Sequence, residues 1–459
     1  MPGATDGAVM SKPVKYRIRE GVAIVTLAKP PNNALTPEVR SELWDIFGRL
    51  VTDTRVTSVM LSAEGDYFSV GPDVREAGEG EGAPTLAEVC ERIESCPRPV
   101  VAALHGLTLG GGAELALAAH WRLADPDSRL GFPEVALGLV CGAGGSQRLP
   151  RIVGADAALR LLLSGRPIAA DAARKLGLVD GIVVGHLPTG THTYAKSIAA
   201  RGTAPRPTRA RRSGLSDGVA FTEAVAHHRA AQAASALIAP ARMIDCVEAA
   251  LLLPFPSGLM FEAAARADCR ADPQSVALTH VFLSERRIST RLLSSTEGRR
   301  TVAEPEGAQI VGRLQHVLGQ TVTALSGQGV SAATIDAAMV DYGFAKGAFG
   351  GTEPGAGREG AEVVPRIVAA LMAAGARLVE TGAVSRPGDV DVLAVYGLGF
   401  PRHRGGPLRA AQSLGLLRMK RLMEGWAEES ALWSPPRLLT EAIKFSAGFD
   451  QLSEGQPAA

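Results

Sequence analysis

Short apolar runs alternate with amphipathic stretches along the first half of this 459-residue chain. Residues 22–27 (VAIVTL), 56–61 and 98–104 are each apolar over the length of one buried strand. Residues 36–38 (TPE) are typical of a helix start, because Thr caps the first turn, Pro fits the first helical position and an acid follows. Strands that alternate with helices predict a layered α/β fold for this half.

The second half lacks such strands and reads as helices. Helical spacing runs through 219–290 and again through 308–445, where Gly and Pro interrupt it. The stretches 200–217 and 290–307 are polar, which is typical of a boundary. We therefore expect a first domain at 14–200, a linker and helical connector at 201–307, and an all-helical region at 308–445.

The last of these parts contains an approximate internal repeat. One copy is GVSAATIDAAMVDYGFAKGAF (329–349) and the other is GAVSRPGDVDVLAVYGLGFPRHRGGP (382–407). Each has a helix that contains a branched residue followed by Asp, and then an aromatic-glycine turn, with registers that differ by about one residue. The pattern predicts a duplicated helical element.

Charge and cysteine content argue against several classes of protein. The formal net charge is +1, so no overall field attracts nucleic acid or an acidic surface. The five cysteines are scattered and odd in number, which argues against a disulfide framework and favours a cytoplasmic location. No apolar run approaches the roughly 18 residues of a membrane helix, and no Cys/His spacing resembles a metal site. The basic stretch 201–212 also contains Pro and Gly, so we interpret it as a solvated linker.

The glycine run at 110–112 has the most specific chemistry. It follows a strand and opens a helix, so its N–H groups are unpaired and the helix dipole adds positive potential. Such a turn suits an oxygen that becomes negative during a reaction. Glu114 lies in the first turn of that helix, and Glu134 follows in a loop. Two carboxylates at one site can divide acid and base work if their surroundings separate their pKa values.

These residues belong to a longer segment that resembles the crotonase (enoyl-CoA hydratase/isomerase) family. GGGAELALAAHWRLA (110–124) and FPEVALGLVCGAGGSQRLPRIVG (132–154) look like the family's signature. Further matches are NAL (33–35), FSVGPDV (68–74) and SGRPIAADAARKLGLVDGIV (164–183). The resemblance covers about 15–195. It implies a layered ββα module that binds an acyl-CoA thioester and uses no other cofactor.

The resemblance also implies roles for individual residues. The Gly111 N–H would be one donor to the thioester oxygen, and Glu114 and Glu134 would hold water and move the C2 proton. Gly142 matches a backbone position near that water. The presence of both glutamates favours hydration of a 2-enoyl-CoA. The positions that match the substrate-binding stretch are Pro72, Asp73, Val74, Arg75 and Gly110.

One residue departs from the family pattern. The family's second oxyanion donor is the backbone N–H just before the loop aspartate, and this position is Pro72, which has no N–H. In a well-studied protease the loss of one such donor costs on the order of 10²–10³ in rate. Three outcomes stay open: a slow hydratase, a shifted loop that supplies another N–H, or loss of this activity.

Two other residues invite a catalytic interpretation. Cys141 takes a commonly apolar or proline position of the family loop, and His120 falls late in the helix after the glycines. We interpret both as packing residues.

The C-terminal part resembles a second enzyme. Residues 366–412, with GFPRHRGGP at 399–407, look like the C-terminal helical domain of 3-hydroxyacyl-CoA dehydrogenase in bifunctional β-oxidation enzymes. Residues 240–288 resemble the helical linker before the dehydrogenase half. A dinucleotide-binding domain would need a strand, a G-x-G-x-x-G turn and a helix, and 289–308 contains nothing of the kind. We therefore expect no NAD binding.

The sequence leaves other functions open. An isomerase or a hydratase–lyase uses the same fold, and Pro72 with the missing domain also fits a CoA-thioester-binding or assembly subunit of low activity. We expect an acyl-CoA partner, no nucleic acid and no membrane span. Trimers are frequent in the family, which leaves a homo-oligomer open.

Overall fold

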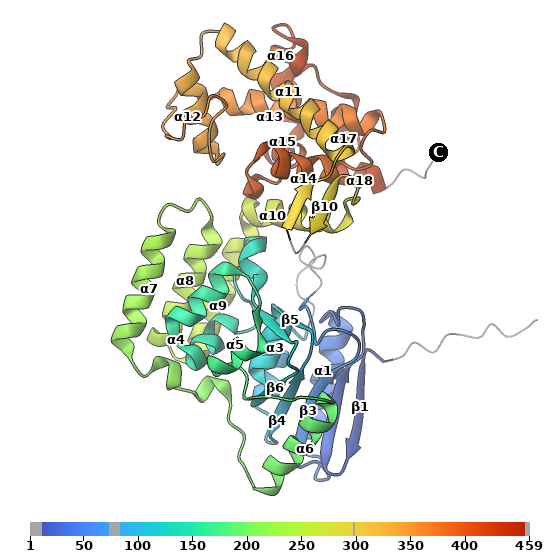
Figure 1. The fold of residues 1–459 in the computed structure, drawn as a ribbon, viewed down its shortest axis with the longest axis vertical. Helices are drawn as coiled ribbons and strands as arrows, with labels where there is room; N and C mark the ends of the chain where they lie inside the picture. Colours follow the sequence, from blue (N-terminus) through green and yellow to red (C-terminus); the bar gives the residue numbers. More distant parts are fainter. Residues whose placement is uncertain (1–11, 73–82, 297–298, 455–459) are drawn as a thin grey trace, which may run out of the picture. The chain divides into compact units, whose positions relative to one another are not determined.

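The computed structural model describes residues 12–72, 83–296 and 299–454. The chain divides into two compact units, 1–269 and 270–459, which we describe separately (Figure 1). This boundary falls inside the stretch expected to be a connector, so its first helices belong with the α/β unit. These helices are α7 (Gly218–Gln232), α8 (Ile238–Leu252) and α9 (Phe255–Ala271).

The first unit is built on a six-stranded sheet. Its first two strands are antiparallel and every other neighbouring pair is parallel. The three apolar runs form three adjacent strands in its middle, as the sequence predicts, so the α/β expectation is confirmed. In sheet order the strands are β1 (Val14–Arg19), β2 (Val22–Leu27), β3 (Ser58–Ala63), β4 (Val100–Leu104), β6 (Trp121–Ala124) and β9 (Gly181–Ile182).

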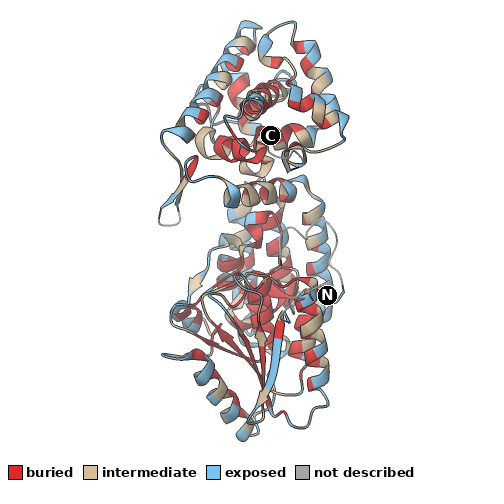
Figure 2. Cartoon of the chain, turned by 90° about the vertical axis from the view of Figure 1, so that its right-hand side faces the viewer, coloured by how far each residue is buried: buried red, intermediate tan, exposed pale blue. Residues whose placement is uncertain are grey.

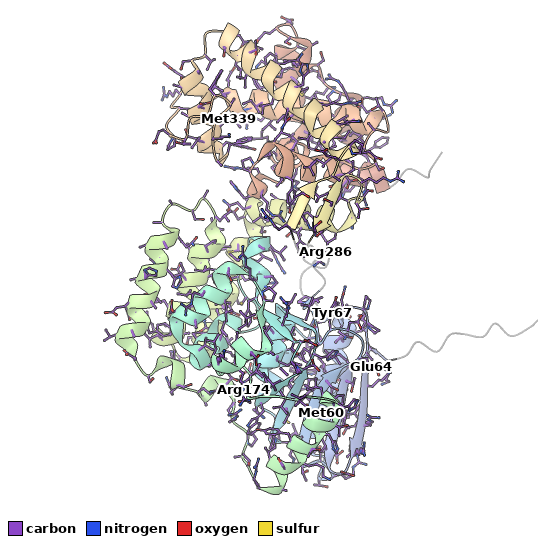
Figure 3. The ribbon with its side chains drawn as sticks, viewed as in Figure 1. Met60, Glu64, Tyr67, Arg174, Arg286 and Met339 are labelled. Carbon is purple, nitrogen blue, oxygen red and sulfur yellow. The ribbon has the colours of Figure 1, made fainter. Side chains whose placement is uncertain are left out.

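The central strands are apolar throughout because both faces of the sheet are covered. Val101 and Ala103 of β4 pack in one cluster with α6 (Leu187–Ala200), and the alternate residues of the strand are equally buried. Met60 of β3 lies in the same cluster beneath α6 (Figure 3). Buried residues accordingly run along the strands in Figure 2. This is the usual pattern of a parallel sheet with helices on its faces.

A second, three-stranded sheet brings two chain segments to one edge. Its strands β5 (Leu107–Leu109) and β7 (Arg129–Gly131) are parallel, so their carboxyl ends lie together. The first leads into Gly110 and α3 (Gly111–Ala118), and the second leads into the 3₁₀ turn η2 (Pro133–Leu137). The Gly110 N–H donates to the Gly131 carbonyl at 2.9 Å, which fastens the two ends to each other.

The basic stretch before α7 packs against the unit, so the prediction of a solvated linker is wrong here. The Thr208 hydroxyl donates to the Leu117 carbonyl at 2.8 Å, and the Arg209 N–H donates to Glu94 at 2.7 Å. Arg206 pairs with Asp180. Arg209 therefore lies against the buried carboxylate of Glu94 at the end of α2 (Leu86–Glu94), and Arg206 lies against the partly buried Asp180 just before β9.

In its described residues the second unit is helical apart from a short hairpin that the sequence pattern did not predict. The hairpin joins β10 (Leu293–Thr296) to β11 (Arg299–Val302). The long helix α13 (Val363–Glu380) is buried along most of its length, and its neighbours pack around it. The expected helical C-terminal region is therefore confirmed. Its other helices are α10 (Pro273–Arg287), α11 (Glu306–Gly327), α12 (Ala332–Tyr342), α14 (Pro387–Leu398), α15 (Pro407–Leu414), α16 (Leu416–Trp426), α17 (Arg437–Lys444) and α18 (Phe449–Glu454).

The two copies of the sequence repeat have the same local geometry. Helices α12 and α14 both end at a left-handed glycine. Asp336 of the first accepts the N–H groups of Phe349 and Gly351, and Asp391 of the second accepts those of Leu408 and Arg409. Each aspartate therefore holds the chain that follows its helix. That the region is a dehydrogenase-type repeat stays a proposal.

Candidate active site

The buried glycine turn before α3 leaves the Gly111 N–H without an acceptor in the described part of the chain. Gly110 has φ +53°, a left-handed conformation that favours glycine. A Cβ on Gly112 would lie 2.3 Å from the Ser69 carbonyl oxygen. Among the described residues no acceptor meets the Gly111 N–H. The turn therefore presents an unpaired donor, as the sequence predicts.

Pro72 lies directly against this donor. Its Cδ atom is 2.6 Å from the point where a Cβ on Gly111 would stand, and the Leu86 side chain is equally close. The Cδ of proline takes the place of an amide hydrogen, so a methylene group is found where the family pattern has an N–H. Of the predicted substrate-binding stretch, Asp73, Val74 and Arg75 lie outside the described residues.

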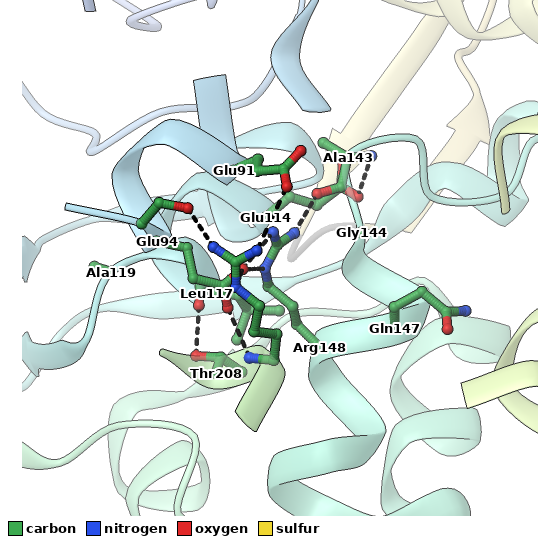
Figure 4. Close-up of polar contacts among 12 residues, drawn as sticks. Glu91, Glu94, Glu114, Leu117, Ala119, Ala143, Gly144, Gln147, Arg148 and Thr208 are labelled. Atoms are coloured by element: carbon green, nitrogen blue, oxygen red, sulfur yellow. Dashed lines mark hydrogen bonds and ion pairs between the residues drawn. The ribbon is translucent and has the colours of Figure 1, made fainter. Parts of the chain in front are cut away.

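Glu114 is a buried carboxylate with three backbone donors. Only 3 % of the residue is exposed. Its Oε1 accepts the N–H groups of Gly142 at 3.2 Å, Ala143 at 2.7 Å and Gly145 at 2.8 Å. These residues form the loop that opens α4 (Gly145–Ser164), so the carboxylate also lies at the positive end of a helix. Figure 4 shows Glu114 beside Ala143.

Glu134 is equally buried but lacks such donors. It is 7 % exposed, and its Oε2 has no hydrogen-bond partner in the described part of the chain. Its Oε1 lies 3.1 Å from the Cβ position of Gly110, so the carboxyl group adjoins the glycine turn. Burial, with the nearby charge of Glu114, raises the pKa of Glu134 to about 8.

The two carboxyl groups are therefore unequal. Burial raises the pKa of Glu114 as well, but three N–H donors and Arg266 act in the opposite direction. Because Glu134 has no comparable donors, it is the group that keeps its proton near neutral pH. Glu134 is thus the neutral acid of the pair, and the N–H donors of the loop favour the ionised form of Glu114. Such a pair can deliver one proton and accept another.

Helix α9 adds two residues that the sequence analysis missed. Glu262 is 1 % exposed and accepts the N–H groups of Gly144 at 2.7 Å and Ser146 at 2.9 Å. Arg266 donates to the Val140 carbonyl at 2.5 Å. In the sequence these two residues are four apart on a helix, a spacing typical of a surface ion pair. Nothing in the pattern shows that Glu262 is buried against the loop and that Arg266, which is partly buried, bonds the Val140 carbonyl.

A buried ion pair holds the loop of residues 142–146 in place. Arg148 of α4 lies 2.9 Å from Glu94 and donates to the Ala143 carbonyl at 2.6 Å (Figure 4). Both charged side chains are at most 1 % exposed. The loop that holds Glu114 is therefore fixed through Arg148 to the end of α2.

We expect Arg148→Met to lower the free energy of unfolding by about 3–5 kcal/mol, because it leaves the buried Glu94 carboxylate without its main counter-charge. The matched control is Arg160→Met on the same helix, which breaks an exposed pair with Asp156. Its expected cost is below about 1 kcal/mol. Denaturation in urea measures both values, and equal losses would contradict a structural role for Arg148.

The weaker candidates are packing residues, as interpreted. The His120 ring accepts the Val100 N–H at 3.0 Å and lies 3.0 Å from the Glu94 carbonyl, so both its nitrogens are used. Burial raises the pKa of the Cys141 thiol well above its usual range, which keeps it neutral. In the described ranges no cluster of three or more His, Cys, Asp or Glu residues is arranged to hold a metal ion. No helix of residues 12–72, 83–296 or 299–454 has the length and hydropathy of a membrane crossing.

Comparisons with known proteins give the family to which the first unit is similar. A family model described as enoyl-CoA hydratase/isomerase matches residues 17–201. A probable enoyl-CoA hydratase of Bacillus subtilis is 43% identical over 174 residues, which are 36% of this chain and 67% of that protein. The peroxisomal bifunctional enzyme of Danio rerio is 35% identical over 269 residues, 59% of this chain but only 37% of the relative.

A solved enoyl-CoA hydratase from Bacillus anthracis is 25% identical, covers 60% of this chain and 96% of its own, and has a TM-score of 0.40. The family match spans the glycine turn, Glu114 and Glu134, and the Bacillus subtilis relative is matched over two thirds of its length. The chain belongs to the enoyl-CoA hydratase/isomerase family.

Proposed function

We propose that the first unit adds water across the 2,3 double bond of an enoyl-CoA thioester. The observation that supports this best is the unequal pair of buried carboxyl groups beside an unpaired N–H donor. Hydration needs one group that takes a proton from water and another that gives a proton to carbon.

Each residue then has one task. The Gly111 N–H stabilises the negative charge that develops on the thioester oxygen. Glu114 takes a proton as the water oxygen bonds to C3, and Glu134 gives its proton to C2. The proton on Glu114 must return to Glu134 before the next turnover. Gly110 keeps the space beside Glu134 free of a side chain.

We propose that the chain works without a nicotinamide cofactor. Between α10 and α11 the described residues form the β10–β11 hairpin, which is too short for a dinucleotide-binding domain. The chain spans less than two fifths of the zebrafish bifunctional relative, so that relative's whole activity is not transferred. A cytoplasmic location is part of the proposal, and it is supported by five buried cysteines that form no disulfide in the described structure.

A second candidate is a CoA-thioester-binding subunit with little turnover, which the methylene of Pro72 beside Gly111 favours. Isomerase and hydratase–lyase activities are the further alternatives on this fold. Crotonyl-CoA, a 3-enoyl-CoA and an aromatic enoyl-CoA assayed side by side separate the enzymes. Binding of acetoacetyl-CoA without turnover of any of them would replace the hydratase proposal by the binding one.

The rate of hydration should fall as the pH rises through about 8, because Glu134 then loses the proton that it must give to C2. The measurement is kcat for crotonyl-CoA between pH 5 and 10. A descending limb that persists unchanged in Glu134→Gln would show that another group is responsible for it.

A further inference from the structure

Five consecutive backbone N–H groups, from Gly142 to Ser146, point at two different carboxylates. Gly142, Ala143 and Gly145 donate to Glu114. Gly144 and Ser146 donate to Glu262, and the Ser146 hydroxyl also donates to it at 2.5 Å. From Ala143 onward the donors alternate, so the loop is held from both sides. A change in the position of either carboxylate must therefore affect the other.

Helix α9 is closely fitted to this loop along one face. A Cβ on Gly258 would lie 2.2 Å from the Gln147 side-chain oxygen, and a Cβ on Gly142 would lie 2.6 Å from the Arg266 side chain. The Leu259 side chain approaches Gly144 in the same way. Glu262 therefore has little freedom to move relative to the loop.

The surroundings of Glu262 are charged on several sides. The other titratable side chains near Glu262 come from α3, η2, α4 and α9. The thiols of Cys90, Cys141 and Cys246 are also affected by its charge, and they are neutral because burial raises their pKa. Negative charge on Glu262 raises the pKa of Glu134 and of those thiols. The titratable and charged side chains are Glu114, Glu134 and Arg148, with Arg266 one turn further along α9.

We propose that Glu262 is a positioning residue for the hydration reaction: by holding Gly144 and Ser146 it directs the alternate N–H groups of the loop toward Glu114. This inference rests on the proposed function and deepens it. Glu262 touches neither water nor substrate in this role. It fixes the direction of the carboxylate that takes the proton from water, so it affects the chemical step more than substrate binding.

The test compares Glu262→Gln with Asp268→Asn, an acid-to-amide change on the same helix. Asp268 is 55 % exposed and pairs with Arg242 at the surface, so its loss should change nothing at the site. Glu262→Gln should lower kcat by about 10–100-fold with little change in KM. A small displacement of a catalytic group, here the Glu114 carboxylate, can lower the rate by about this factor.

Burial and the charge of Glu114 raise the pKa of Glu262 to about 7, so Glu262 carries negative charge above that pH. The descending limb of the variant's pH profile should move slightly to lower pH, because burial and Glu114 remain as the main causes of the raised pKa of Glu134 and only the smaller contribution of Glu262 is lost.

Hydrogen exchange of residues 142–146 gives a readout that does not depend on turnover. Glu262→Gln should speed exchange at Gly144 and Ser146, and Asp268→Asn should not. If Glu262→Gln does not fold, Ser146→Ala, which removes the hydroxyl that donates to Glu262 and accepts from the Gln147 amide, should show the same changes in a milder form. Kinetics, pH profile and exchange equal to those of Asp268→Asn would overturn the inference. If the wild type hydrates no enoyl-CoA, the proposed function fails, and the exchange rates still decide whether Glu262 holds the loop.

Discussion

Glu114→Gln and Glu134→Gln each lower kcat for crotonyl-CoA hydration by about 10²–10⁴-fold, the usual contribution of a positioned acid or base. The amide of Glu114→Gln would keep an oxygen for the loop N–H groups but accept no proton from water, and the amide of Glu134→Gln would have no acidic proton to give to C2. The measurement is the loss of absorbance of the enoyl thioester under saturating substrate. Acetoacetyl-CoA binding should persist in both variants, because neither change removes the Gly111 donor.

The matched control is Glu91→Gln on α2, an acid that is 55 % exposed and makes one long ion pair with Arg209. It should retain the wild-type rate. Should Glu134→Gln also retain that rate, the neutral carboxyl group would have no part in the reaction and hydration would need another acid.

Stability against pH separates a catalytic loss from a folding defect. The native pKa of Glu134, about 8, lies above its ordinary value of 4.5, so the native state binds more protons than the unfolded state between these values. The contribution of this group to stability is therefore full below about 4.5 and is lost as the pH rises through about 8. Because Glu134→Gln cannot ionise, its Tm at pH 9 should be no lower than that of the wild type.

The sequence predicts strands well where the sheet buries both faces. The apolar runs of β2, β3 and β4 are continuous because helices or other layers cover them on each side. The edge strand β1 reads VKYRIR and exposes most of its residues, and β6 and β9 are too short to show a period. These strands are fixed by their neighbours in the sheet and not by their own pattern.

Some residues of the candidate site could likewise be predicted from the sequence, and others could not. The sequence predicts Glu114 and Glu134 because the glycine run before a helix and the resemblance of 110–154 to the family signature mark their positions. Glu262 could not be predicted, since its partners are backbone N–H groups more than a hundred residues away. Backbone N–H donors do not depend on residue type, so they produce no sequence pattern. Only the packing of α9 on the loop shows that Glu262 is a third carboxylate at this site.

If the thioester oxygen lies at the Gly111 N–H, as proposed, Pro72 limits the rate that this site can reach. Stabilisation of the thioester oxygen by two N–H donors is stronger than by one, and here Gly111 has a methylene group of Pro72 beside it. The Leu86 side chain lies against the same glycine, so the neighbourhood of the oxygen is more apolar than a two-donor site. A single donor in such surroundings predicts a slow hydratase, and the CoA-thioester-binding subunit with little turnover is the alternative that the same contact favours.

Pro72→Ala should therefore raise kcat for crotonyl-CoA, by up to about 10²-fold, because it restores an N–H beside the Gly111 donor. The KM should change less than kcat, since the new hydrogen bond strengthens as charge develops on the oxygen. Pro188→Ala, the same substitution in the first turn of α6, is the control and should leave the rate unchanged. An unchanged or lower rate in Pro72→Ala would mean that this backbone position does not face the thioester oxygen, and that the second donor comes from another N–H.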